Sequence, residues 1–75
     1  MKHEFEQEYK QIGLKVAYYR KMQGLTQEKL AEKVEVATSY IGQIEAAGMY
    51  KPISLTTLLR IAKALDTPAY KFLDF

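Results

Sequence analysis

The chain has 75 residues, enough for one domain near the lower end of the size that buries a self-sufficient core. It contains no cysteine, so disulfide staples, thiolate metal sites and cysteine nucleophiles are excluded. Eleven Lys and Arg against nine Asp and Glu give a net charge of +2, so any nucleic-acid role must rest on where residues lie, not on total charge.

The first predicted element is a helix over residues 5–23. Ile12, Val16 and Tyr19 recur there with the spacing of one helical face. Gly24 follows directly and suits a left-handed C-terminal cap, which ends the helix.

Two short helices are predicted next, joined by a tight turn at residues 35–37. Thr26 can cap the first of them through its hydroxyl, and Glu28 adds favourable charge to its first turn. The second covers residues 38–46. Their predicted buried face consists of Leu30, Ala31, Val34, Ile41 and Ile44.

Pro52 makes residues 49–53 a loop, and Ser54 then caps a fourth helix. Thr67 and Pro68 have the cap-then-proline arrangement of a helix start, so residues 69–75 are predicted as a final short helix. The fourth helix carries an apolar stripe of Leu55, Leu58, Leu59, Ile61, Ala62 and Leu65. No segment alternates with a period of two. The prediction is an all-α fold of five helices in a single domain, residues 1–75.

Residues 27–46 have the pattern of a helix-turn-helix motif. Two short helices at a steep angle must touch through a few fixed positions, and those positions are apolar here while the residues between them are polar. The second helix is left with an outward stripe that could face a DNA groove, made of Thr38, Ser39, Gly42 and Gln43.

The chain resembles the phage-repressor and Cro-type (XRE family) helix-turn-helix proteins in four stretches, residues 25–31, 39–45, 51–59 and 61–65. The resemblance extends from about residue 12 to residue 73. It implies a compact lambda-repressor-like fold. It also implies a sequence-specific, double-stranded DNA-binding transcriptional regulator, a repressor or an activator, that reads the major groove with a helix starting near Thr38.

The resemblance also implies roles for individual positions. Arg20 and Glu45 match a pair that often forms a salt bridge between the first and third helices. The positions that meet base edges are Thr38, Ser39, Gly42 and Gln43. The positions near DNA phosphates are Gln27, Tyr40, Tyr50 and Lys51.

Each role has a structural alternative. Gln27 contacts a phosphate, or it is an ordinary first-turn residue of its helix. Thr38 and Ser39 contact DNA, or they simply begin a solvated helix, since both residue types favour first turns. Gln43 can pair bidentately with adenine, or it is a surface glutamine. Gly42 reflects close approach of the helix backbone to DNA, or simple tolerance of glycine. Tyr40 and Tyr50 bond phosphates, or they pack over the rim of the core, and Lys51 is a phosphate contact or a solvated charge.

Two positions depart from the family pattern. The turn residue usually seen as glycine is Glu35, although glycine tolerates positive φ best. The usual Ser or Thr cap of the reading helix is Ala37, which should cost about 1 kcal/mol of capping. Residues 38–46 also lack Arg and Lys, so we expect modest affinity, readout of DNA shape and methyl groups, and strong salt dependence.

Residues 70–75, the tail, are unusually apolar for a chain end. Family members usually bind palindromic sites as dimers. We therefore expect a homodimer, with the dimer contact drawn from Tyr70, Phe72, Leu73 and Phe75. The alternative is that all four side chains fold back within the monomer.

Several classes of function lack support. No glycine-rich phosphate loop, carboxylate pair or nucleophile–base arrangement is present, so we expect no enzyme, no cofactor and no small-molecule ligand. His3 is the only histidine and lies in a terminus expected to fray, so no metal site is expected. The N-terminus lacks the apolar stretch of a signal peptide, and no apolar run approaches membrane-spanning length, so the expectation is a cytoplasmic protein without a membrane partner.

One other function stays open. The weak charge also fits a helix-turn-helix scaffold that acts mainly as a protein-interaction module, antitoxin-like or as a co-regulator.

Overall fold

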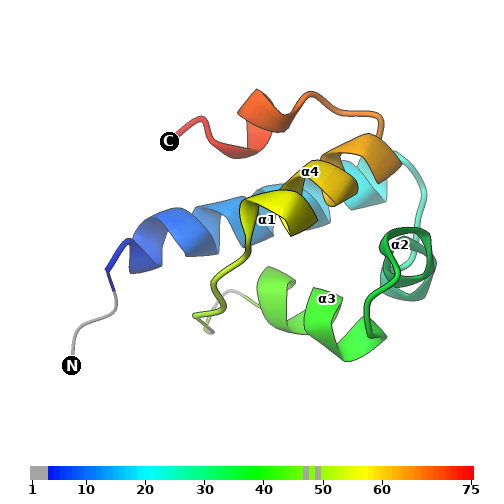
Figure 1. The fold of residues 1–75 in the computed structure, drawn as a ribbon, viewed down its shortest axis with the longest axis horizontal. Helices are drawn as coiled ribbons and strands as arrows, with labels where there is room; N and C mark the ends of the chain where they lie inside the picture. The colour runs from blue at the N-terminus through cyan, green and yellow to red at the C-terminus, as the bar shows by residue number, and fades with distance from the viewer. Residues whose placement is uncertain (1–3, 47, 49) are drawn as a thin grey trace.

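The computed structural model describes residues 4–46, 48 and 50–75, and within them it contains four α-helices and one short 3₁₀ helix. In chain order these elements are α1 (Glu6–Met22), α2 (Gln27–Val34), α3 (Thr38–Glu45), α4 (Leu55–Ala64) and η1 (Ala69–Phe72) (Figure 1). No strand occurs among the described residues, so the all-α prediction is confirmed. None of the described helices has the length and apolarity that a membrane span requires.

The prediction of a fifth helix over residues 69–75 is wrong. The segment makes one 3₁₀ turn, and Thr67 does not cap it; the Thr67 hydroxyl donates to the Leu65 carbonyl at 2.9 Å. Phe72 explains the tight turn, because its ring is fully buried and lies 5.3 Å from the Tyr19 ring on α1. The four-residue 3₁₀ turn thus places the Phe72 ring in the core.

Local signals place the helix ends as expected. The Thr26 hydroxyl accepts a hydrogen bond from the Lys29 N–H at 3.0 Å, and the Ser54 hydroxyl accepts one from the Thr57 N–H at 3.1 Å. Gly24 has a φ of +73°, the left-handed conformation expected after the end of α1.

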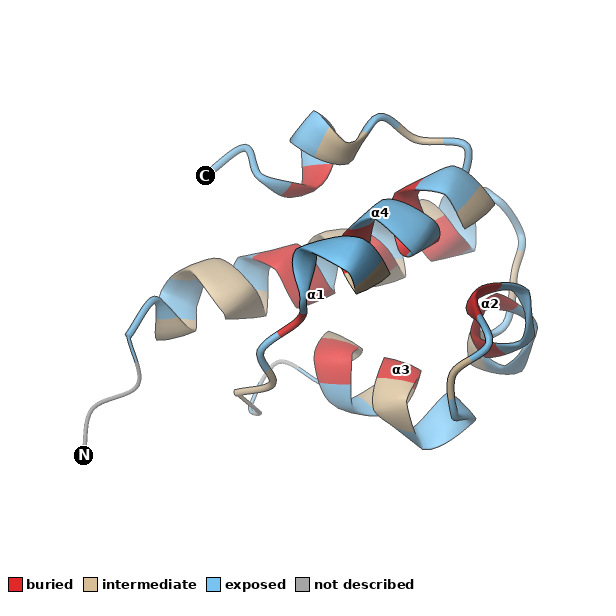
Figure 2. Ribbon diagram, in the orientation of Figure 1, coloured by how far each residue is buried: buried red, intermediate tan, exposed pale blue. Residues whose placement is uncertain are grey.

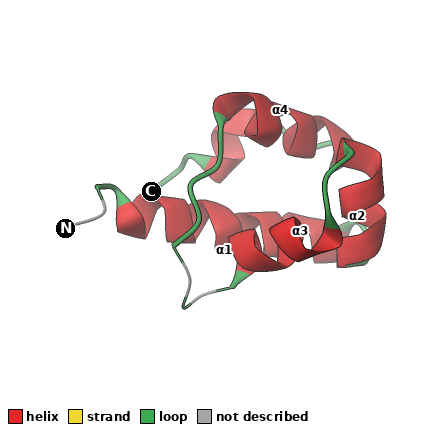
Figure 3. Ribbon diagram, turned by 60° about the horizontal axis from the view of Figure 1, so that its bottom comes forward, coloured by secondary structure: helices red, strands yellow, loops and turns green. Residues whose placement is uncertain are grey.

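The helices enclose one apolar core (Figure 2). Figure 3 shows α1 and α3 side by side, with α2 packed against α3 and α4, while η1 packs on α1 and α4. The predicted inner face of α2 and α3 is buried, from Leu30 to Ile44. The predicted stripe of α4 is only partly correct: Leu55 and Leu59 are 64% and 48% exposed. The contacts of α4 with α2 and η1 therefore leave these two leucines largely open to solvent.

Gly13 allows α1 and α3 to approach closely. A Cβ built at Gly13 would lie 1.8 Å from the carbonyl oxygen of Ile44, so any side chain would collide with the backbone of α3. The sequence contained no sign of this contact, because the two residues are far apart in the chain.

Candidate nucleic-acid interface

The helix α3 presents its polar face to solvent. Ile41 and Ile44 are buried in the core and set the rotation of the helix about its axis. The predicted base-contact residues therefore lie on the outer side: Thr38, Ser39 and Gln43 are exposed and Gly42 is half-buried. The helix ends at Glu45, one residue before the predicted boundary.

The turn before α3 accommodates both departures from the family pattern. Glu35 adopts the left-handed conformation with φ of 59° and ψ of 45°, which is the conformation that glycine usually supplies. Its N–H donates back to the Glu32 carbonyl at 3.3 Å, and the Val36 N–H donates to the Ala31 carbonyl at 3.0 Å. Ala37 occupies the N-cap position of α3 with extended backbone and makes no capping hydrogen bond. The turn is thus closed by backbone hydrogen bonds and not by special side chains.

A buried ion pair joins α1 to α3. The Arg20 guanidinium donates twice to Glu45, from Nε to Oε2 at 2.7 Å and from Nη2 to Oε1 at 2.9 Å. A third Arg20 bond, from Nη1, reaches the Leu25 carbonyl at 2.7 Å. The Arg20 and Glu45 side chains are only 10% and 6% exposed. The pair implied by the resemblance is therefore present, and it also ties down the segment that leads into α2.

Gln27, the first residue of α2, is attached to the same carboxylate. Its Nε2 donates to Glu45 Oε1 at 3.0 Å, so the first residue of α2 and the last residue of α3 are linked directly. A primary amide carries two N–H donors, and this bond uses one of them. The second donor has no partner in the part of the chain that the structure describes.

The loop that follows α3 is held by aromatic contacts. Lys51 Nζ lies 5.6 Å from the centroid of the Tyr40 ring, above a residue of α3. The Tyr50 ring meets the Tyr9 ring of α1 at 6.0 Å between centroids and an interplanar angle of 83°. Tyr40, Tyr50 and Lys51 are each half-buried, so part of each side chain is packed against the protein.

Few charged residues lie on the candidate DNA-facing surface, which consists of the predicted contact residues of α2, α3 and the loop after α3. The only charged residue of α3 is Glu45, which the ion pair neutralises. Of the two lysines on α2, Lys29 lies 3.8 Å from Glu32 on the outside of the helix. Lys51 is the one cation among the residues to which the sequence assigned DNA contacts.

The tail residues have different surroundings. Phe72 is 0% exposed within the monomer, so it is removed from the predicted dimer-contact set. Tyr70, Leu73 and Phe75 are 69%, 45% and 59% exposed. Lys15 on α1 holds the end of the tail, because its Nζ donates to the Asp74 carbonyl and lies 5.2 Å from the Phe75 ring centroid.

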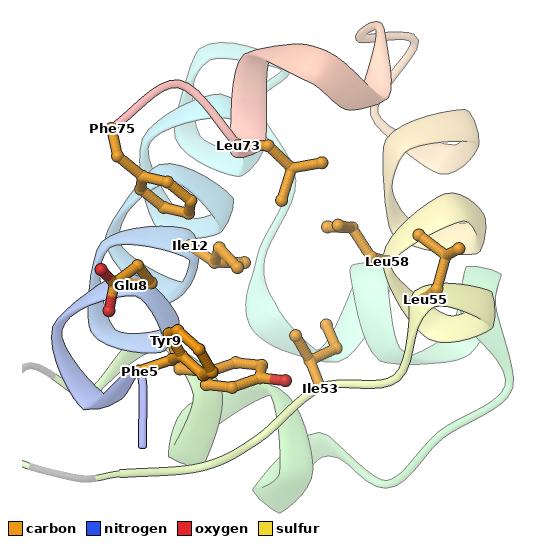
Figure 4. Close-up of a pocket in the computed structure, with 9 residues that line it drawn as sticks. All are labelled: Phe5, Glu8, Tyr9, Ile12, Ile53, Leu55, Leu58, Leu73 and Phe75. Atoms are coloured by element: carbon orange, nitrogen blue, oxygen red, sulfur yellow. The ribbon is translucent and has the colours of Figure 1, made fainter. Parts of the chain in front are cut away.

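The tail and α1 form two walls of an apolar groove of about 320 Å³. Figure 4 shows Leu73 and Phe75 on one side, Tyr9 and Phe5 on another and Leu58 and Leu55 on a third. Phe5, Tyr9 and Leu55 were missed by the sequence reasoning. Phe5 and Leu55 are both 64% exposed, and their place in one groove depends on how α1, α4 and the tail pack together.

No group of three or more His, Asp or Glu side chains capable of holding a metal occurs in the described residues, and His3 lies outside them.

Known proteins share this sequence pattern. A family model described as helix-turn-helix matches residues 16–72. The chain is 36% identical, over 63 residues, to the HTH-type transcriptional regulator SinR of Bacillus subtilis (strain 168); the match covers 84% of this chain and 56% of SinR. It is 40% identical over 58 residues to the control protein C.SmaI of Serratia marcescens, covering 77% of this chain and 67% of C.SmaI.

Solved structures share the fold. A crystal structure of SinR, the master regulator for biofilm formation, in complex with DNA superposes with a TM-score of 0.75 at 36% identity, covering 84% of this chain and 98% of that one. The restriction-modification controller protein C.AhdI from Aeromonas hydrophila gives a TM-score of 0.77 at 30% identity, covering 88% and 96%.

Proposed function

The chain belongs to the helix-turn-helix family, and we propose on that premise that it is a sequence-specific, double-stranded DNA-binding transcriptional regulator that acts in the cytoplasm. One observation carries the proposal: α3 exposes a polar face while its apolar face is buried and its end is anchored by Arg20 and Gln27 through Glu45. A helix presented in this way can enter a major groove without rearrangement.

In the proposed complex, base edges are read by the outer face of α3. Gln43 offers an amide that pairs bidentately with adenine, and Thr38 and Ser39 offer hydroxyls in the first turn. A Cβ at Gly42 would meet only the Gln27 amide oxygen, at 3.6 Å, so packing within the protein does not require glycine here. The absence of a Cβ would allow the helix backbone to approach the groove.

The phosphate contacts lie on both sides of α3. Gln27, in the first turn of α2, would donate its second amide N–H to one phosphate. Lys51, with Tyr40 and Tyr50, would contact another. Because few charges take part, affinity depends on shape and on a small number of phosphate contacts.

We further propose that the protein binds as a homodimer through the apolar groove. Four large apolar side chains at its rim, Phe5, Leu55, Leu73 and Phe75, are between 45% and 64% exposed. Burying them against a second copy would remove this apolar surface from water and present two copies of α3 to half-sites about one helical turn apart.

Selection from a random duplex library at low salt tests the proposal. Enrichment of a palindromic sequence is expected. Failure to enrich any sequence would refute DNA reading and favour the alternative of a protein-interaction module, to which the exposed groove would then belong.

Two variants test the separate roles on the selected duplex. Gln43→Ala should relax the preference at one base pair by about 1–3 kcal/mol. Lys51→Ala should weaken all sequences alike and reduce the salt slope by about one. Identical effects of the two variants would contradict the assigned roles.

A further inference from the structure

Residues 50–54 lie outside every helix of the described chain, yet they carry two of the proposed phosphate contacts. Pro52 in the middle of this segment has no N–H to donate. Side-chain packing contributes to the position of this segment, through the ring contact of Tyr50 and the contact of Lys51 with the Tyr40 ring.

Three side chains anchor the segment to three places. Ile53 is buried in the core at 7% exposure. Lys51 packs over the Tyr40 ring of α3, and Tyr50 packs edge-on against the Tyr9 ring of α1. The loop thus contacts both α1 and α3, and Tyr9 is its aromatic contact on α1.

Tyr9 is well placed to hold its partner. It is half-buried and packs against the core, in the first half of a 17-residue helix. It lies outside the helix-turn-helix motif, and no DNA contact was assigned to it. Figure 4 shows its ring between α1 and the segment that carries Ile53.

We propose that Tyr9 is a positioning residue for the phosphate contacts, which it supports by holding Tyr50 and so keeping Lys51 within reach of the DNA backbone. This inference rests on the proposed DNA-binding function. An edge-to-face ring pair is strong enough to change affinity by about two- to tenfold when it is lost.

A positioning role of Tyr9 predicts a particular pattern of DNA affinities. Since Tyr9 acts through the phosphate loop, its loss weakens binding to every sequence by the same factor and leaves base preference unchanged. Its effect must also overlap with that of Lys51, because both changes remove the same contact.

The experiment measures duplex binding by fluorescence anisotropy at several salt concentrations, for the selected duplex and for one with a changed base pair. The variants are Tyr9→Leu, which keeps apolar bulk in the core, Tyr9→Phe, which keeps the ring, Lys51→Ala, and the double variant Tyr9→Leu/Lys51→Ala. Tyr18→Leu is the matched control, because Tyr18 is an exposed tyrosine of the same helix that pairs with Tyr19. Thermal unfolding is measured for every variant, and binding is measured at a temperature at which all of them are folded.

We expect Tyr9→Leu to bind both duplexes about two- to tenfold more weakly, with a reduced salt slope. Tyr9→Phe and Tyr18→Leu should bind with the affinity of the wild type. The double variant should lose little affinity beyond the loss caused by Lys51→Ala alone. Wild-type binding by Tyr9→Leu, a changed base preference, or full additivity in the double variant would overturn the inference alone. Absence of wild-type binding to any duplex would overturn the proposed function, and the inference with it.

Discussion

Two glycines lie inside helices of this chain, and the space around each differs completely. At Gly13 a Cβ would collide with the backbone of α3, at 1.8 Å from the Ile44 carbonyl oxygen. At Gly42 a Cβ would meet only the end of the Gln27 side chain, at an ordinary 3.6 Å. Packing therefore requires glycine at this position of α1, whereas packing within the protein does not require it at Gly42 of α3.

The same substitution at both positions tests this difference. Gly13→Ala should lower the free energy of unfolding by about 1–3 kcal/mol, because the overlap forces α1 and α3 apart. Gly42→Ala should raise it by roughly 0.5–1 kcal/mol, since alanine is the better helix former and the space is open. Chemical denaturation measures both, and each variant is the other's control.

Gly42→Ala also tests whether the backbone of α3 contributes to DNA affinity. If the backbone of α3 approaches the groove there, the more stable variant should bind the selected duplex more weakly. Unchanged affinity in the anisotropy assay would show that glycine is merely tolerated at this position.

At the scale of elements, α3 is attached at its two ends in different ways. Its C-terminal end is held by the ion pair and by Gln27, while its N-terminal end has no side-chain cap at Ala37. The helix that is proposed to read DNA therefore has a firmly anchored end and a weakly capped end.

Supplying the missing cap should stabilise the protein. Ala37→Ser should raise the free energy of unfolding by about 1 kcal/mol, because the backbone of residue 37 is already extended as a cap requires. Thr26→Ala, which removes the existing cap of α2, should lower it by a similar amount. A destabilising effect of Ala37→Ser in thermal or chemical unfolding would show that the turn cannot accept the hydroxyl.

The ion pair is expected to fix geometry more than it adds stability. Arg20→Met alone should cost about 3–5 kcal/mol, because it leaves a buried carboxylate without its partner. The double variant Arg20→Met/Glu45→Leu should recover most of that loss, since apolar side chains then replace both charges.

The double variant should nevertheless bind DNA more weakly than the wild type. Gln27 loses its bond to Glu45, and α2 is no longer linked to the end of α3. Recovery of stability together with full DNA affinity would contradict a positioning role for the pair. Denaturation and anisotropy on the same preparations separate the two effects.

At the scale of the whole molecule, four of the large exposed apolar side chains lie together in one groove. One groove gathers exposed side chains from the start of α1, the start of α4 and the tail, and the Lys15 contacts hold the tail in place there. Two copies joined at this groove would carry two reading helices.

Polar substitution at the groove rim should weaken the proposed dimer. Leu55→Ser should raise the dimer dissociation constant at least about tenfold, because each copy loses the burial of a large apolar side chain. Sedimentation measures this directly. Tyr18→Ser, an exposed residue outside the groove, is the control. Equal behaviour of the two variants would place the contact elsewhere.

The sequence predicted the helices and most of their ends, as well as the buried faces of α2 and α3. The hydroxyl caps of Thr26 and Ser54 act on N–H groups three residues away, and the left-handed Gly24 acts within one turn. Signals of this range can be read from neighbouring residues alone. The motif of residues 27–46 is predictable for the same reason, because its spacing is local.

Composition and periodicity determined by themselves an all-α chain with a helix-turn-helix motif and a polar face on the helix that begins at Thr38. Only the tertiary structure decided that Phe72 is buried while Phe75 lies at the surface. It also decided that α3 packs directly against Gly13 and that the Tyr9 ring contacts the Tyr50 ring. Each of these depends on a contact between residues 30 or more positions apart, or on which side of the core a short tail crosses. Such contacts follow from how the helices pack together, which no stretch of neighbouring residues records.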